Sequence, residues 1–324
     1  MTNARISAIA PNYAESVRDL EDLAAEFGPF KGRFLYKAPR DWINIAIEEI
    51  ETNPKLDVVS TAKLKEFKRR IESQGYLVNP WGKVETRDWA DAVASQREKG
   101  HQFEYVVKHR DSPEPEDALS WEDCFSDLRD PDHAKHQWVI QGRIAEYREA
   151  MQPLLYNASN VFLIDRFFDP LSSGMHLLKF VLQDLKTVSR CSTLNIISEK
   201  RSVDPESAEQ YFADLEQSLI DEYEGSRPKN LILKWHILWN DKRFIERDSS
   251  YFEAHDRYFL TNQGGIQLGN GFETRKAKVN DQYFANYLSK PTFEKTFARF
   301  NIVAQGVGSI GKLGSRRVTH LNVG

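Results

Sequence analysis

The sequence lacks the residues and runs that mark several common classes of protein. Its two cysteines, Cys124 and Cys191, stand far apart in unrelated contexts, which excludes a disulfide framework and a CxxC metal site. No apolar run approaches the roughly 18 residues that a membrane span requires, and the N-terminus has no charged-then-apolar leader. We therefore expect a cytoplasmic protein without a transmembrane segment.

Histidine is also sparse, with eight in 324 residues. Only His133 and His136 stand close together, among carboxylates, and this His-x2-His spacing can bind a metal. No second cluster at ligand spacing follows, and surface histidines in a loop are the simpler interpretation. We expect neither a metal nor a cofactor.

What is present is an ordinary globular composition, 40% hydrophobic and 28% charged, with enough Trp and Phe for real cores. The length suits one large or two ordinary domains. A net charge of −4 argues against an indiscriminate nucleic-acid binder. From Arg275 onward, however, nine basic residues stand against two acidic ones. This tail is a candidate polyanion contact through Lys312, Arg316 and Arg317, with a solvated basic face as the alternative.

Residues 1–110 contain no known motif and predict a small mixed α/β domain of unassigned role. Apolar spacing predicts helices and short strands in this part, the helices over 12–27, 42–51, 61–74 and 89–97, the strands over 32–36, 76–78 and 103–107. A proline-rich acidic stretch from Asp111 to Asp117 is typical of a linker. We expect 111–154 to form an acidic linker and a helix that begins at 136.

From Asn160 onward, strands and helices alternate. The patterns predict strands at VFLID, TLNIIS and LILKWHILW, with helices over 175–186 and 204–224. We predict an α/β protein, α+β in its N-terminal part, with a mixed sheet covered by helices in its C-terminal part. The carboxyl ends of strands are where α/β ligand sites collect, so Asp165, Arg166 and Ser198 are candidate site residues.

A predicted hairpin follows, with YFLT and GIQL as its strands and a glycine turn between them. Period-two alternation puts His255 and Arg257 on one face of the first strand. An arginine fork beside an imidazole suits a phosphate or another anion. Gly269 and Asn270 can bring backbone N–H groups to the same anion. The alternative is a buried histidine beside a salt-bridged arginine in an ordinary hairpin.

This stretch resembles the half-site signature of the phospholipase D superfamily, H-x-K-x4-D followed by a glycine seven residues on. His255 occupies the histidine position, Arg257 the lysine, Asn262 the aspartate and Gly269 the glycine. It is more similar to the phospholipase-D-like C-terminal domain found after the microtubule-interacting-and-trafficking (MIT) module, whose signature runs HDR, a glycine turn and I-x-I-G-x-G-hydrophobic. The likeness covers 155–275. It leaves 276–324 as a basic C-terminal segment with a helix over 281–299, a strand at NIVAQ and a glycine-rich tail.

The resemblance implies half a phospholipase-D fold and a non-catalytic protein that binds an anionic ligand, whether a lipid headgroup, a nucleotide or nucleic acid. The implied phosphate-binding set is His255, Arg257, Asn262, Gly269, Asn270, Asp165, Arg166 and Ser198. One alternative is a homodimeric phosphodiesterase or nuclease with His255 as nucleophile and Arg257 stabilising the developing charge. Another is a scaffold whose residues 1–110 bind a partner protein. The architecture is similar in style to accessory proteins of bacterial anti-phage defence systems.

Overall fold

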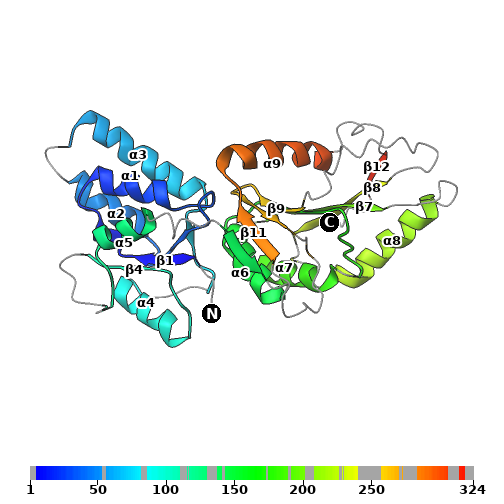
Figure 1. Cartoon of the computed structure of the whole chain (residues 1–324), viewed down its shortest axis with the longest axis horizontal. Coiled ribbons are helices and arrows are strands. Elements are labelled where there is room, and N and C mark those ends of the chain that lie inside the picture. The colour runs from blue at the N-terminus through cyan, green and yellow to red at the C-terminus, as the bar shows by residue number, and fades with distance from the viewer. Residues whose placement is uncertain are drawn as a thin grey trace. The chain divides into compact units, whose positions relative to one another are not determined.

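The computed structural model divides into two compact units, Met1–His136 and Gln137–Gly324 (Figure 1). Both units pack helices on β-sheets, so the chain is α/β as the sequence predicts. Among the described helices, none is long and apolar enough to cross a membrane. The structure describes residues 5–52, 56–81, 86–109, 115, 117–129, 137–140, 143–172, 174–188, 191–200, 208–225, 228, 230–239, 257–269, 272, 283–305 and 314–317.

The sheet of the first unit is parallel, in the order β3-β2-β1-β4. Its strands are β1 (Ile6–Ile9), β2 (Phe34–Tyr36), β3 (Leu77–Val78) and β4 (Val106–Val107). The helices that the structure describes around it are a 3-10 turn (Pro11–Tyr13), α1 (Val17–Glu26), α2 (Trp42–Glu51), α3 (Val58–Ser73), α4 (Trp89–Glu98) and α5 (Trp121–Arg129). The sequence patterns did not predict β1, whose four residues are all buried and show no alternation.

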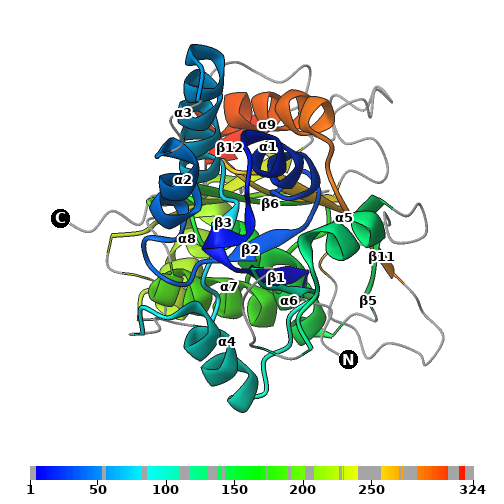
Figure 2. The same ribbon diagram turned by 90° about the vertical axis from the view of Figure 1, so that its left-hand side faces the viewer.

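Helices α1, α2, α3 and α5 cover one face of this sheet and α4 covers the other (Figures 1 and 2). The first helix begins later than predicted because Ser16 accepts the N–H of Asp19, whose carboxylate in turn accepts the N–H of Ser16. After α3 the chain turns at Gly75, whose φ of 67° lies in the left-handed region that favours glycine.

The boundary between the units differs from those the sequence suggested at 110, 154 and 275. Trp121, Cys124 and Leu128 of α5 lie in the core of the first unit, so the acidic stretch leads into a packed helix. The strand β5 (Gln137–Ile140) and the segments after 275 join the sheet of the second unit. One division after His136 therefore replaces the three predicted ones.

The second unit has a mixed sheet in the order β12-β8-β7-β6-β9-β10-β11-β5 within the described residues. Its further strands are β6 (Asn160–Asp165), β7 (Thr193–Lys200), β8 (Ile232–Trp239), β9 (Arg257–Thr261), β10 (Gly265–Leu268), β11 (Tyr283–Tyr287) and β12 (Gly314–Arg317). Strands β6, β7 and β8 pair in parallel, whereas the other pairings are antiparallel. The helices described here are α6 (Ile144–Leu155), α7 (Met175–Val188), α8 (Ala208–Tyr223) and α9 (Lys290–Gln305).

Three predictions for the second unit were wrong. The helix predicted from 136 is β5 followed by α6, and the helix predicted over 281–299 is β11 followed by α9. Pro291 lies in the first turn of α9, where its missing N–H has no intrahelical acceptor to lose. NIVAQ is the end of α9, not a strand. Residues 204–207 of the helix predicted over 204–224 lie outside the described part.

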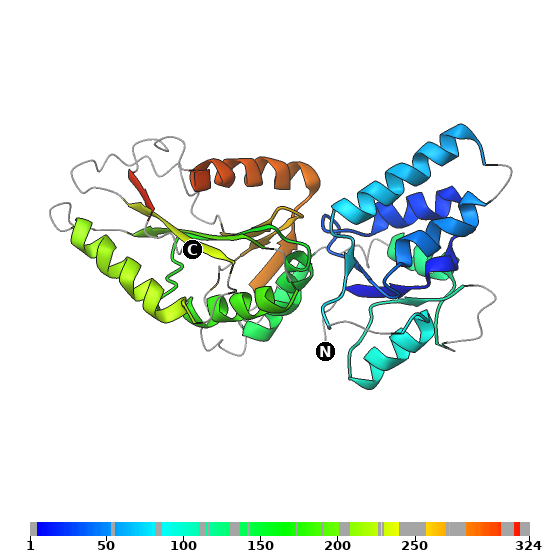
Figure 3. The ribbon, with the colours of Figure 1, turned by 180° about the vertical axis from the view of Figure 1, so that it is seen from behind.

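Helix α9 covers one face of this sheet, and α6 and α7 cover the other (Figure 3). Side chains of β6 therefore alternate between these two layers. Phe162 faces α9, because its ring lies 5.4 Å from that of Phe297. Asp165 is three residues further on and therefore faces the α6 and α7 side. Phe272, which donates its N–H to Asp165, contacts Tyr147 of α6 on that same side.

Candidate functional site

The carboxyl end of β6 brings Asp165 opposite Arg257, the first residue of β9. The Arg257 Nε atom lies 3.7 Å from Asp165 Oδ1, and its Nη1 donates a hydrogen bond to the carbonyl oxygen of Gly269 at 3.1 Å. The side chain of Arg257 is 16% exposed, against 3% for Asp165. The guanidinium is thus held near the surface by a buried carboxylate and a backbone carbonyl.

Asp165 was predicted to belong to the phosphate-binding set, but in the structure it binds backbone N–H groups. Its Oδ1 accepts the N–H of Phe167 and its Oδ2 accepts the N–H of Phe272, each at 2.9 Å. The carboxylate therefore ties together the end of β6, the start of β9 and the loop after β10. A buried carboxylate repels phosphate, so its role at this site is to position Arg257 rather than to contact an anion.

An exposed aromatic ring stands beside this arginine. Phe167 is 50% exposed, whereas the next residue, Phe168, is 3% exposed. The Cζ atom of Arg257 lies 5.9 Å from the centre of the Phe167 ring and that of Arg166 lies 5.7 Å from it, within cation–π range. Arg166 and Arg257 therefore do lie together, as predicted. Phe167 was not among the predicted site residues, although two consecutive phenylalanines shortly after a buried strand were a signal that one of them stays outside.

A second ion pair of this unit, between a buried aspartate and an arginine whose side chain is 43% exposed, shows what is distinctive about Arg257. Arg148 on α6 donates from Nη2 to Asp184 Oδ1 at 2.8 Å and from Nε to Asp184 Oδ2 at 3.2 Å. Burial raises the pKa of Asp184, and Arg148 partly offsets this by lowering it. Two hydrogen bonds therefore join the Arg148 guanidinium to both oxygens of the Asp184 carboxylate. The Arg257 pair is looser, and Arg257 Nη2 makes no hydrogen bond to a described residue.

Two predicted site residues have structural roles instead. Ser198 follows Ile197, which pairs with Ile164, so it is beside Asp165 in the sheet, but it is 1% exposed and accepts the indole N–H of Trp235 at 2.8 Å. A solvent-borne ligand cannot reach it there.

Asn262 lies at the far end of β9 from Arg257. Its Oδ1 accepts the backbone N–H of Ser159 at 2.7 Å and that of Asn160 at 3.3 Å. The prediction that it contacts the same anion as Arg257 is therefore wrong. Among the described residues, only the side-chain oxygen of Asn262 takes part in hydrogen bonds.

The remaining predicted residues are only partly placed. His255, Asn270 and Lys312 lie outside the described residues, as do His133 and His136. Arg316 and Arg317 belong to β12, where they pair with Ile237 and His236 at an edge of the sheet. The described part of the chain contains no group of three or more side chains suited to a metal.

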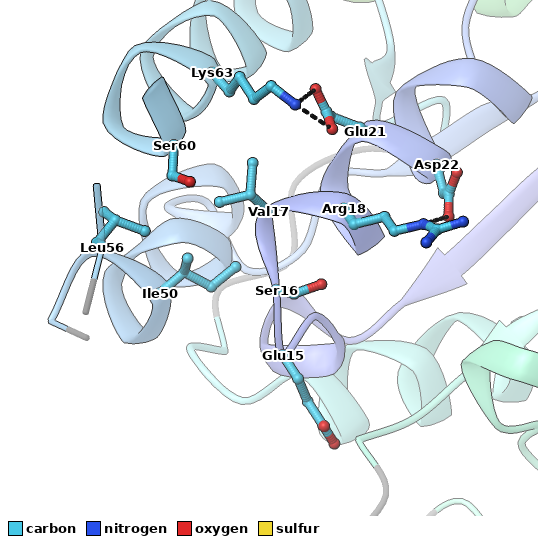
Figure 4. A pocket seen from close by; sticks show the side chains of 10 residues that line it. All are labelled: Glu15, Ser16, Val17, Arg18, Glu21, Asp22, Ile50, Leu56, Ser60 and Lys63. Atoms are coloured by element: carbon cyan, nitrogen blue, oxygen red, sulfur yellow. Dashed lines mark hydrogen bonds and ion pairs between the residues drawn. The ribbon is translucent and has the colours of Figure 1, made fainter. Parts of the chain in front are cut away.

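Two hollows among the described residues of the first unit were not indicated by the sequence. One, of about 560 Å³, lies between α1, the end of α2 and the start of α3, and four of its charged residues form ion pairs, Lys63 with Glu21 and Arg18 with Asp22 (Figure 4). The other, of about 360 Å³, lies beside Lys108 after β4 and is rimmed by Glu15, Asp19 and Glu122. Acidic rims suit an anion poorly.

No family model matches the chain, and none of the curated proteins compared with it is a match. One solved structure with a weak likeness is that of TrmBL2, described as an archaeal chromatin protein that shows a novel mode of DNA binding. It is 11% identical over 83% of each chain, with a TM-score of 0.26. A likeness at that score carries no conclusion about fold or function.

Proposed function

We propose that the unit Gln137–Gly324 is a non-catalytic, phospholipase-D-like module that recognises phosphate through Arg257. The carrying observation is the loose ion pair at the end of β6. The guanidinium is fixed by Asp165 and Gly269, yet it does not close a bidentate pair as Arg148 does with Asp184. Within the described part of the chain, its remaining N–H donors have no hydrogen-bond acceptor, and such donors suit a phosphate oxygen.

Position and preorganisation support this assignment. The site lies at the carboxyl end of β6, the parallel-strand end at which α/β sheets collect ligands. Because Asp165 and Gly269 already orient the guanidinium, an incoming phosphate does not have to order a free side chain. Arg166 adds a second positive charge within reach of the same Phe167 ring.

The test compares two matched arginine substitutions. Arg257→Gln and Arg148→Gln each remove a guanidinium from a carboxylate that is 3% exposed and from a neighbouring Phe ring. Calorimetric titration with pyrophosphate should show binding to the wild type and to Arg148→Gln. Arg257→Gln should weaken it about 10- to 150-fold, the loss expected for a charge-assisted hydrogen bond.

Circular dichroism establishes that both variants remain folded. Equal pyrophosphate affinity in wild type and Arg257→Gln would rule out the assignment, as would the absence of any binding to the wild type. The same proteins tested on anionic liposomes, single- and double-stranded DNA and RNA give the macromolecular source of the phosphate. If the wild type binds no polyanion in that panel, the result would favour the alternative of a scaffold whose residues 1–110 bind a partner protein.

A further inference from the structure

We propose that the ligand at Arg257 is a nucleotide, free or within single-stranded nucleic acid, whose base stacks on Phe167. The inference rests on the proposed phosphate site and names its ligand class. A phosphate alone requires only guanidinium groups. The half-exposed ring of Phe167 beside them is an additional feature, and it suits a planar group that can stack on it.

Phe167 is held in its exposed place. Its backbone N–H is bound by Asp165 Oδ1 at 2.9 Å, and the N–H of Phe168 is bound by the Asp165 carbonyl oxygen at 3.1 Å. These two bonds fix the turn, which buries Phe168 and leaves Phe167 outside. The half-exposed ring leaves apolar surface in water, which a stacked base would cover.

The neighbouring charges define what can stack there. The Arg166 and Arg257 guanidinium groups lie within 5.7 and 5.9 Å of the ring, so a base on Phe167 would carry its phosphate to one of them. Aromatic rings with arginines are the composition of single-strand sites, because every base has a π-face and every nucleotide a phosphate. An inositol or glycerol headgroup has the phosphate but no flat face.

A second exposed phenylalanine of the unit provides the control. Phe284 of β11 is 41% exposed, but Tyr287 of the same strand donates to Ala150 of α6, so alternation puts Phe284 on the opposite face of the sheet. Among the described residues, no guanidinium stands over its ring in the way that Arg257 stands over Phe167. Loss of this ring should leave nucleotide binding unchanged.

The experiment measures fluorescence anisotropy with short oligothymidylate and with an abasic oligonucleotide of the same length and backbone. We expect the wild type to bind oligothymidylate about 5- to 150-fold more tightly than the abasic strand, the range for one stacked base. Phe167→Ala should abolish this difference without changing abasic affinity. Phe167→Trp and Phe284→Ala should both preserve it. Thymidine diphosphate compared with pyrophosphate repeats the test for a free nucleotide.

The outcomes separate the two proposals. Equal affinity of the wild type for base-bearing and abasic ligands in both formats overturns the stacking inference and leaves phosphate recognition intact. A preference that survives in Phe167→Ala also overturns it, since the base would then stack elsewhere. Binding of neither strand, and of neither small phosphate, overturns the proposed function and the inference together. Preference for thymidine diphosphate without oligonucleotide binding assigns the free nucleotide as the source.

Discussion

The two units use an aspartate beside a candidate site in opposite ways. In the first unit, Asp19 lies half-buried in the first turn of α1 and accepts the N–H groups of Glu15 and Ser16, so the carboxylate stays at the rim of the hollow after β1 and β4. In the second unit, Asp165 is buried and holds a guanidinium at the surface. The first arrangement presents negative charge to a ligand, the second positive. The location of a site in an α/β sheet is therefore not enough to tell what it binds, because the side chains beside it set the sign of its charge.

The largest expected effect is on stability, and it is measured by comparing Asp165→Asn with Asp19→Asn. Asp165→Asn leaves Arg257 without its buried counter-charge and replaces an acceptor of a backbone N–H, so we expect the second unit to lose about 3–5 kcal/mol. Asp19→Asn weakens the capping box that Asp19 forms with Ser16, and should cost the first unit about 0.5–2 kcal/mol. Urea unfolding of both variants measures these losses.

Each unit contains one buried cysteine, so the rate at which each thiol is alkylated shows which unit unfolds. Burial raises the pKa of Cys124 to about 12 and that of Cys191 to about 11, so neither native thiol is reactive at neutral pH. Asp165→Asn should speed alkylation of Cys191 and leave Cys124 unchanged. Equal acceleration of both would contradict an effect confined to the second unit.

A smaller effect distinguishes the two ends of β9. Asn262→Ala removes an acceptor shared by the N–H groups of Ser159 and Asn160, and should lower stability by about 1 kcal/mol. Asn262→Asp keeps that oxygen and should be close to neutral. Neither change should alter pyrophosphate affinity, measured as for Arg257→Gln. A loss of pyrophosphate affinity in either variant would show that Asn262 does contribute to the anion site.

The smallest expected effect is a difference in carboxyl titration. Burial raises the pKa of Asp184 in the second unit above 3.8, whereas the N–H of Ser60 lowers the pKa of Asp57, an exposed cap in the first. Asp184 therefore stabilises its unit below pH 3.8 and loses this contribution as pH rises through its higher pKa. Asp57 contributes above pH 3.8 and loses its contribution as pH falls.

Carbon-13 NMR of the side-chain carboxyls resolves the two titrations. Arg148→Gln should raise the Asp184 midpoint further, because it removes the cation that opposes burial, and should leave Asp57 unchanged. An unchanged or lower Asp184 midpoint in that variant would contradict the assignment of Arg148 as the cation that opposes burial.

The sequence predicted the elements whose periodicity was unambiguous. The strands at VFLID, TLNIIS and YFLT and the helices over 42–51 and 175–186 are where they were expected. It failed where short apolar segments fit either period: 137–140 and 283–287 have apolar residues spaced for a helix, yet they pair as β5 and β11. Only long-range pairing, which no local pattern encodes, decides these segments.

The candidate site was predicted in the same partial way. Strand ends put Asp165 and Arg166 at one edge, and the hairpin motif supplied Arg257, all of which the structure brings together. The sequence did not predict the hydrogen-bond partners of the other side chains. That Ser198 would be covered by Trp235, and that Asn262 would bind backbone at the other end, depends on which side chain packs over which.

The position of β5 has a consequence for how the chain matures on the ribosome. This strand is the first of its unit to be synthesised, yet its sheet partner is β11, more than a hundred residues later. The first unit can finish folding while β5 still waits, edge unpaired, for the last quarter of the chain to emerge. Premature termination before β11 would release a polypeptide with one finished unit and a strand without a neighbour, a natural substrate for chaperones and proteases.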